Sequence, residues 1–296
     1  MTLPRLNDLV FFGTDEFAVT VLEELSRGNC RPAIIVTSPD TRAGRGRRLA
    51  APPVKLWAEQ NKIPCLQPEN SRSDLVTSLR SDLGLVASYG QVIPPSIFNS
   101  PKYGTLNIHP SLLPKYRGPT PIQTAILNGD AETGVTLMLL DTELDHGPIL
   151  KAKSCKLKAK SFIEARDNLA RLGAEMFIEA APLWAAGKIK ALSQDHTQAT
   201  YTKKIRKEDG EINLSQGDTL RDKGVALYRK FLAYRGWPGI YFFIGWNGKK
   251  MRVIVTAAHL ENNHFIIDRV KPEGKKDMPW ADFQRGVKNH IYFRQS

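Results

Sequence analysis

Leu9-Val10-Phe11-Phe12-Gly13-Thr14 is a short, continuous apolar run that ends at a glycine and a threonine. A run of this kind, without alternation between polar and apolar residues, is typical of a strand buried on both faces of a parallel sheet. A helical pattern follows directly, because Phe17, Val21, Leu22 and Leu25 recur on one helical face. A buried strand joined to an amphipathic helix is the repeating unit of an α/β fold.

The same alternation continues through the first half of the chain. Strand-like segments lie at 33–36, 83–87, 105–108, 135–140 and 148–150, and helical patterns at 53–60, 73–80 and 122–127. Because alternating strands and helices build a sheet whose strands run mostly in parallel, we predict a doubly wound, Rossmann-like α/β domain. A long amphipathic helix, with an apolar stripe from Phe162 to Leu183, completes this domain.

The pattern changes after residue 188. Residues 189–206 are largely polar and basic, which is typical of a linker. Beyond them, Asn247-Gly248 separates two apolar runs, and this pair favours the type I′ turn of a β-hairpin. We therefore predict a first domain at 1–188, a linker at 189–206, and a small β-barrel of the oligonucleotide-binding (OB-like) kind at 207–296.

The formal net charge of the chain is +12, and much of the excess lies in two places. One is the loop Arg42-Ala43-Gly44-Arg45-Gly46-Arg47-Arg48, and the other is residues 203–296, where 19 Lys and Arg accompany 10 Asp and Glu. Arginine offers paired donors that match phosphate oxygens. Two focal basic patches favour a bound polyanion over a uniformly basic surface. The loop taken alone fits a solvated charged loop equally well.

The composition disfavours several classes of protein. No apolar run is long enough to span a membrane, and residues 1–8 leave no room for a secretory or transit segment. Cys30, Cys65 and Cys155 lie far apart, without the spacing of a metal site. We expect a cytoplasmic protein with reduced thiols, no metal site and no membrane partner.

The stretch Asn107-Ile108-His109-Pro110-Ser111-Leu112-Leu113-Pro114-Lys115-Tyr116-Arg117-Gly118 begins at the end of a predicted strand. Ligands of open α/β sheets bind beyond the carboxyl ends of the strands. If the strand stays extended, Asn107 and His109 point to the same side. An amide and an imidazole can stabilise the negative oxygen of an acyl-transfer intermediate, and the imidazole can also carry a proton. Alone, an Asn-x-His pair is better explained as an ordinary turn.

A second polar stretch, Leu140-Asp141-Thr142-Glu143-Leu144-Asp145-His146-Gly147-Pro148-Ile149, lies between two predicted strands. A carboxylate in this turn can orient the imidazole of His109 or relay the proton that leaves an attacking amine. Acidic residues are also ordinary components of turns. Spacing alone does not distinguish Asp145 from Asp141 or Glu143.

Taken together, Asn107, His109 and Asp145, with Ser111-Leu112-Leu113-Pro114 between them, resemble the catalytic motif of the folate-dependent formyltransferases. Further stretches resemble the methionyl-tRNA formyltransferases of that superfamily, and the likeness extends over nearly the whole chain. These stretches include Phe12-Gly13-Thr14-Asp15-Glu16-Phe17-Ala18, Ser88-Tyr89-Gly90-Gln91-Val92-Ile93-Pro94, Gly129-Asp130-Ala131-Glu132-Thr133-Gly134-Val135-Thr136 and Gly236-Trp237-Pro238-Gly239. The family pattern is broken by Asp15 at a usual Pro, by Glu143 at a usual Gly and by His146 at a common Thr.

The resemblance implies an enzyme that transfers the formyl group of 10-formyltetrahydrofolate to the free amino group of methionyl-initiator tRNA, for translation initiation. It implies catalysis by Asn107, His109 and Asp145 without a metal ion. The implied folate contacts are Ser111, Leu112, Leu113, Pro114, Tyr89, Gly90, Gln91 and Ile93. The implied tRNA contacts are the basic C-terminal barrel and Arg42, Arg45, Arg47 and Arg48. We expect the enzyme to act as a monomer.

Two alternatives remain open at this point. A sugar-nucleotide N-formyltransferase or a glycinamide ribonucleotide transformylase shares a similar motif but has less need of a basic loop and a basic second domain. A non-catalytic RNA-binding protein of the same fold does not require Asn107, His109 and Asp145. Both basic features and all three residues are present here, which favours a tRNA-modifying enzyme.

Overall fold

The computed structural model describes residues 8–43, 48–69, 81–157, 161–213, 223–246 and 248–287. The chain divides into two compact units, and each unit collects separate stretches of sequence. The first comprises Met1–Pro121, Glu132–Lys156 and Arg166–Thr202, and the second comprises Ile122–Ala131, Leu157–Ala165 and Lys203–Ser296. The helix predicted at 73–80 lies outside the described residues.

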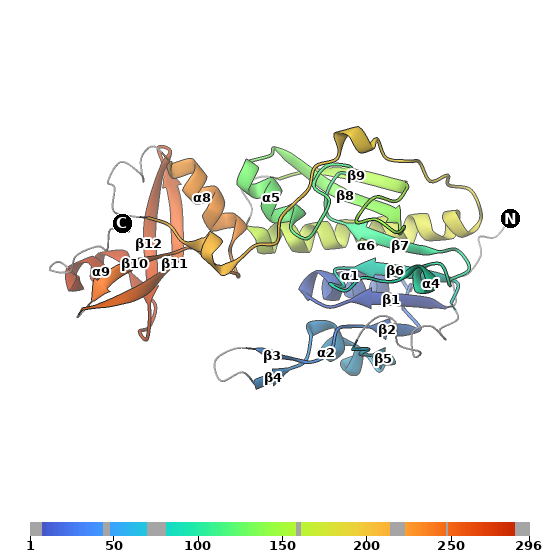
Figure 1. Ribbon diagram of the computed structural model, residues 1–296, viewed down its shortest axis with the longest axis horizontal. Helices are drawn as coiled ribbons and strands as arrows, with labels where there is room; N and C mark the ends of the chain where they lie inside the picture. Colours follow the sequence, from blue (N-terminus) through green and yellow to red (C-terminus); the bar gives the residue numbers. More distant parts are fainter. Residues whose placement is uncertain are drawn as a thin grey trace. The chain divides into compact units, whose positions relative to one another are not determined.

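The first unit is built on a seven-stranded sheet of order β5-β2-β1-β6-β7-β8-β9 (Figure 1). Its strands are β1 (Leu9–Gly13), β2 (Ile34–Val36), β5 (Cys65–Leu66), β6 (Leu83–Ala87), β7 (Thr105–His109), β8 (Glu132–Leu139) and β9 (Ile149–Lys156). Neighbours from β5 to β7 pair in parallel, whereas β8 is antiparallel to both β7 and β9. Every residue of β1, β6 and β7 is buried, and for β1 the continuous apolar run predicted this.

The sheet reverses its direction of growth at β1, which pairs with β2 on one side and with β6 on the other. The loops that leave these strands are tied together by Thr14, which follows β1. Its hydroxyl donates to the Tyr89 carbonyl at 2.7 Å and lies 3.0 Å from the Ser38 hydroxyl. A reversal of this kind opens a crevice at the carboxyl edge of the strands, where α/β proteins bind their ligands.

Helices of the first unit pack on this sheet, and α1 (Glu16–Arg27), α2 (Pro53–Gln60) and α6 (Phe162–Ala185) agree with patterns predicted from the sequence. The short helix α4 (Pro95–Phe98) was not predicted, and α5 (Pro121–Asn128) belongs to the second unit from Ile122 on. The α1 helix buries Phe17, Val21, Leu22 and Leu25. The α6 helix approaches β7 so closely that a Cβ added at Gly173 would overlap the Ile108 side chain. These contacts confirm a doubly wound α/β unit with a mostly parallel sheet.

Asp15, which stands where the family pattern has a proline, caps the first turn of α1. Its carboxylate accepts hydrogen bonds from the backbone N–H groups of Phe17 and Ala18, at 3.0 and 3.3 Å. The hydroxyl of Ser88 donates to the second carboxylate oxygen at 2.6 Å. Burial raises the pKa of Asp15, and the hydrogen bonds oppose this shift. The departure therefore supplies a side-chain cap that proline cannot provide.

The second unit contains a four-stranded antiparallel sheet of order β10-β11-β12-β13. Its strands are β10 (Tyr241–Trp246), β11 (Lys249–Glu261), β12 (His264–Pro272) and β13 (Met278–Pro279), and its helices are α8 (Gly224–Ala233) and α9 (Trp280–Gly286). Trp246 pairs with Lys249, so two residues connect β10 to β11, which confirms the predicted hairpin. Phe242 packs against Trp280 and Phe283 of α9, with ring centroids 5.9 and 6.3 Å apart. The β-rich second unit also agrees with the fold class predicted.

A third, smaller sheet consists of β3 (Thr41–Ala43) and β4 (Arg48–Ala50), which pair as an antiparallel hairpin in the first unit. Two short 3₁₀ helices follow α6 in the chain, η1 (His196–Gln198) and η2 (Lys207–Gly210). Within the described ranges, no helix combines the length and the apolar character that crossing a membrane requires.

Candidate active site

Asn107 and His109 lie at the carboxyl end of β7 and contact the same carboxylate. Both side chains are buried, with exposed fractions of 8% and 4%. They are two residues apart in a fully extended strand, so they project from one face of the sheet. The third predicted residue, Asp145, reaches this face from the loop between β8 and β9.

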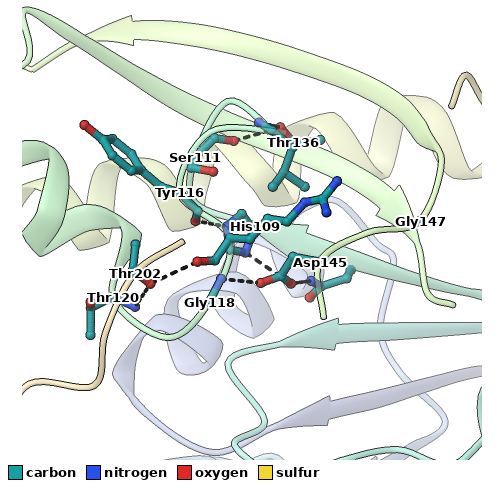
Figure 2. A network of polar contacts seen from close by, with 12 residues as sticks. His109, Ser111, Tyr116, Gly118, Thr120, Thr136, Asp145, Gly147 and Thr202 are labelled. Carbon is teal, nitrogen blue, oxygen red and sulfur yellow. Dashed lines mark hydrogen bonds and ion pairs between the residues drawn. The ribbon is translucent and has the colours of Figure 1, made fainter. Parts of the chain in front are cut away.

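The Asp145 carboxylate faces His109 and the backbone of Gly118 (Figure 2), and Asn107 contacts the same carboxylate. One carboxylate oxygen, Oδ1, lies 3.4 Å from Nδ2 of Asn107 and 3.5 Å from Nδ1 of His109. The other, Oδ2, accepts a hydrogen bond of 2.7 Å from the backbone N–H of Gly118. The backbone of Asp145 is left-handed, with φ of 51°. This conformation is uncommon for a residue with a side chain and is a frequent feature of functional loops.

The orientation of the His109 ring follows from its second nitrogen. Nε2 lies 3.0 Å from the carbonyl oxygen of Tyr116, which can only accept a hydrogen bond, so Nε2 carries a proton. Nδ1 faces Asp145 and is the nitrogen left for proton exchange. The site thus combines an amide donor, an imidazole and a carboxylate in a buried position, groups that can assist acyl transfer.

The segment Ser111–Pro114 follows β7 and is fixed by Thr136 of β8. The Thr136 hydroxyl donates to the Ser111 carbonyl at 2.7 Å and accepts from the Leu113 backbone N–H at 3.0 Å. The Ser111 hydroxyl is turned inward and donates to the Lys115 carbonyl at 2.6 Å. Ser111 and Leu113 are therefore buried, whereas Leu112 and Pro114 stay partly exposed.

The second segment expected to meet the folate, Tyr89 to Ile93, follows β6 at the same edge of the sheet. The Tyr89 ring packs into the core, edge-on to Phe12 at a centroid distance of 5.6 Å. Gly90 is exposed with φ of 75°, and the Val92 side chain is 89% exposed. Gln91 and Ile93 are partly buried. The solvent-accessible part of this segment therefore runs from Gly90 to Ile93.

The basic loop is described only in part. Arg42 belongs to β3 and is exposed, and Arg48 begins β4. Arg45 and Arg47, which were also predicted to contact tRNA, lie outside the described residues.

Two buried polar residues beside the site were not singled out from the sequence. Arg117 is 2% exposed and Gln194 is 6% exposed. A guanidinium Nη2 of Arg117 donates to Oε1 of Gln194 at 2.7 Å, and Nε2 of Gln194 donates to the carbonyls of Asp145 and Gly147. Arg117 lay within the quoted motif, but its burial depends on contacts with residues 194–201, which local sequence does not reveal.

Comparison with known families assigns the chain. Residues 7–181, which include all three site residues, match the family model described as formyl transferase. The chain belongs to the formyl transferase family. Among curated members, the methionyl-tRNA formyltransferase of Chloroflexus aurantiacus is 42% identical over 254 residues, which cover 84% of this chain and 79% of that protein. The enzyme of the same name from Roseiflexus sp. is 36% identical over 95% of this chain and 92% of its own length.

Two solved structures show the same fold. A 4-N formyltransferase from Francisella tularensis superposes with a TM-score of 0.63 at 20% identity, over 86% of this chain and 98% of that chain. HypX from Aquifex aeolicus in complex with tetrahydrofolic acid gives a TM-score of 0.63 at 18% identity, over 97% of this chain. The match spans 51% of HypX. At this identity the likeness concerns the fold alone.

Proposed function

We propose that this formyl transferase moves the formyl group of 10-formyltetrahydrofolate to the amino group of methionine esterified to initiator tRNA. The observation that carries the proposal is the buried contact of Asn107 and His109 with Asp145. It occurs in a chain whose relatives, at 36% to 42% identity over most of its length, are methionyl-tRNA formyltransferases. We infer the reaction from the residues of the site, and we infer the acceptor from the names of the relatives.

Each of the three side chains has a distinct role in the proposal. Asn107 and protonated His109 hold the oxygen that becomes negative when the amine attacks the formyl carbon. Asp145 orients His109 and helps to move a proton from the amine towards N10 of the folate, which leaves as tetrahydrofolate when its bond to the formyl carbon breaks. Because the Tyr116 carbonyl occupies Nε2 of His109, the hydrogen that protonated His109 directs to the oxyanion is on Nδ1, and Asp145 accepts the proton from the amine. The 3.5 Å between Nδ1 and Asp145 is expected to shorten when substrate binds, as catalytic contacts commonly do.

The carboxyl edge of the sheet fits the folate. A pterin is a flat ring whose rim carries hydrogen-bond donors and acceptors, so it needs an apolar wall beside accessible backbone groups. The segment from Gly90 to Ile93 offers both, with the exposed Val92 side chain next to open backbone at Gly90. Partly exposed Leu112 and Pro114 belong to the segment that Thr136 fixes beyond β7. No metal ion takes part in the proposed reaction.

Binding of the acceptor tRNA is assigned to the basic parts of the chain. We propose that Arg42, Arg45, Arg47 and Arg48 contact the acceptor end of the tRNA, and that residues 207–296 form a tRNA-binding domain. Arginine and lysine bind nucleic acid mainly through phosphates. We propose that the enzyme acts as a monomer, in the cytoplasm with its tRNA.

Binding of tRNA is expected to weaken steeply as salt is added. If the enzyme neutralises roughly six to ten phosphates, its affinity falls by about 10³- to 10⁵-fold between roughly 50 and 200 mM salt. Replacing Arg42 by Ala should reduce the slope of log affinity against log salt by about 1. Fluorescence titration of labelled tRNA measures both effects. Arg27→Ala, which removes an exposed arginine at the end of α1, serves as control, and a salt-independent affinity contradicts this assignment.

The acceptor is tested by direct competition. Purified enzyme and 10-formyltetrahydrofolate are offered initiator and elongator tRNA, each charged with methionine, and an amino-sugar nucleotide. We expect formylation of the initiator methionyl-tRNA, with much slower transfer to the other two. Transfer to the sugar alone would retain the catalytic roles of Asn107, His109 and Asp145 and remove the tRNA from the proposal.

A further inference from the structure

We infer that Gln194, held in orientation by Arg117, is a positioning residue for Asp145. The inference rests on the proposed function, in which Asp145 is catalytic. Gln194 lies far from Asp145 in the sequence, in the segment that follows α6. Its side-chain amide nevertheless joins the backbone on both sides of His146, in the loop that carries Asp145.

The loop needs this support because the Asp145 backbone is left-handed, with φ of 51°. A residue with a Cβ is sterically strained in this conformation. The conformation persists only where surrounding contacts fix the backbone. Nε2 of Gln194 donates to the Asp145 carbonyl at 3.0 Å and to the Gly147 carbonyl at 2.8 Å. Both amide hydrogens of Gln194 are thus used on the loop. These two bonds fix the peptide groups that set the direction of the Asp145 side chain.

Arg117 decides which way the Gln194 amide faces. A guanidinium only donates hydrogen bonds, so the group 2.7 Å from its Nη2 must be the amide oxygen of Gln194. The amide nitrogen then necessarily faces the two carbonyls. Because Gln194 and Arg117 are 6% and 2% exposed, water does not compete freely for these bonds.

The same guanidinium supports a second point of the loop. Nη2 of Arg117 also lies 2.8 Å from Nδ1 of His196, so this nitrogen is unprotonated and accepts the bond. The His196 ring stacks on His146 at a centroid distance of 3.9 Å and an angle of 4°. His146 in turn lies 2.6 Å, from Nδ1 to Oδ2, from Asp141. His146, a departure from the family pattern, therefore belongs to the support of the Asp145 loop.

The anchor of this arrangement is itself fixed. The Arg117 backbone N–H donates to the Thr200 carbonyl at 2.8 Å, and the Thr202 N–H donates to the Arg117 carbonyl at 2.8 Å. The next residue, Gly118, donates its N–H to the Asp145 carboxylate. The segment that contains Arg117 and Gly118 thus acts on Asp145 in two ways. Gly118 orients the Asp145 carboxylate directly, and Arg117 orients the Asp145 backbone indirectly through Gln194.

The test variant is Gln194→Glu. A glutamate keeps an oxygen for Arg117 and gains charge attraction to it, but in its ionised form it has no N–H for the two loop carbonyls. We expect kcat to fall by about 10- to 100-fold, as a small displacement of a catalytic group does, with the KM for either substrate changed less than about threefold. Gln198→Glu makes the same change in charge on the same segment, and its side chain contacts Asp195 rather than the loop. This control should keep the wild-type kcat.

A double-mutant comparison separates positioning from general damage. If Gln194 acts through Asp145, Gln194→Glu should lower kcat little further in an Asp145→Asn background. An equal loss in both backgrounds overturns the inference. If Gln194→Glu does not fold, Gln194→Met, which also removes both donors at similar volume, is used in the same comparison.

Hydrogen exchange gives a readout independent of the reaction. Gln194→Glu should speed amide exchange in a peptide covering residues 140–148 and leave the β1 and β6 strands unchanged. Unchanged exchange in this peptide overturns the inference, whatever the enzyme formylates. Faster exchange confined to it supports the positioning role even if wild-type enzyme proves inactive on methionyl-tRNA, an outcome that would remove the proposed acceptor and not the loop contact.

Discussion

Asp145→Asn is expected to lower kcat of formyl transfer by about 10²- to 10⁴-fold, the range of a positioned acid–base group. Asparagine keeps the shape and can still accept the hydrogen bond that Gly118 donates at 2.7 Å. It loses the negative charge that lies 3.5 Å from Nδ1 of His109, and it places a donor group near the Asn107 amide, 3.4 Å away. The imidazolium then has no carboxylate partner, and the proton leaving the amine has no anionic acceptor.

Single-turnover measurements with saturating substrates isolate this effect from binding. The affinity for the folate should change less than about threefold, because Asp145 is assigned to the chemical step. Asp167→Asn is the matched control, since Asp167 lies on α6 and pairs with the neighbouring Arg166. If Asp145→Asn kept more than about a tenth of the wild-type rate, Asp145 would not have the role assigned to it.

Several features of this site were predictable from local sequence because local physics determines them. A continuous apolar run specifies the buried strand β1, and strand-like segments locate β6 and β7. Once β7 is extended, the alternation of side chains places Asn107 and His109 on one face. The predicted helix after β1 follows in the same way from its apolar face. Each of these inferences concerns residues that belong to a single strand or helix.

The remaining features depend on contacts between distant residues. Spacing did not separate Asp145 from Asp141 and Glu143, because the choice is made by how the loop returns over β7. Gln194 lies in a segment predicted as a linker, yet its amide meets the loop at residues 145 and 147. The burial of Arg117 requires partners about 80 residues later in the chain. No periodicity encodes contacts of this range.

Asn107 is the residue whose replacement tests the oxyanion assignment. Asn107→Ala is expected to lower kcat by about 10²- to 10³-fold, the usual effect of removing one donor to a developing oxyanion. One amide hydrogen of Asn107 is directed to Oδ1 of Asp145 at 3.4 Å, and the other is available to the substrate oxygen. Because the oxygen gains charge only as the amine attacks, KM should change much less than kcat.

Asn107→Asp distinguishes donation from mere filling of space. Aspartate has nearly the volume of asparagine, so a role in packing alone predicts an active enzyme. An ionised aspartate has no hydrogen to donate and adds a second negative charge next to Asp145, where the oxyanion must form. We therefore expect Asn107→Asp to be at least as slow as Asn107→Ala at neutral pH, in single-turnover assays at saturating folate. If Asn107→Asp were instead nearly as fast as wild type, the oxyanion would have to be held by His109 or by backbone N–H groups, and Asn107 would serve only to fill space.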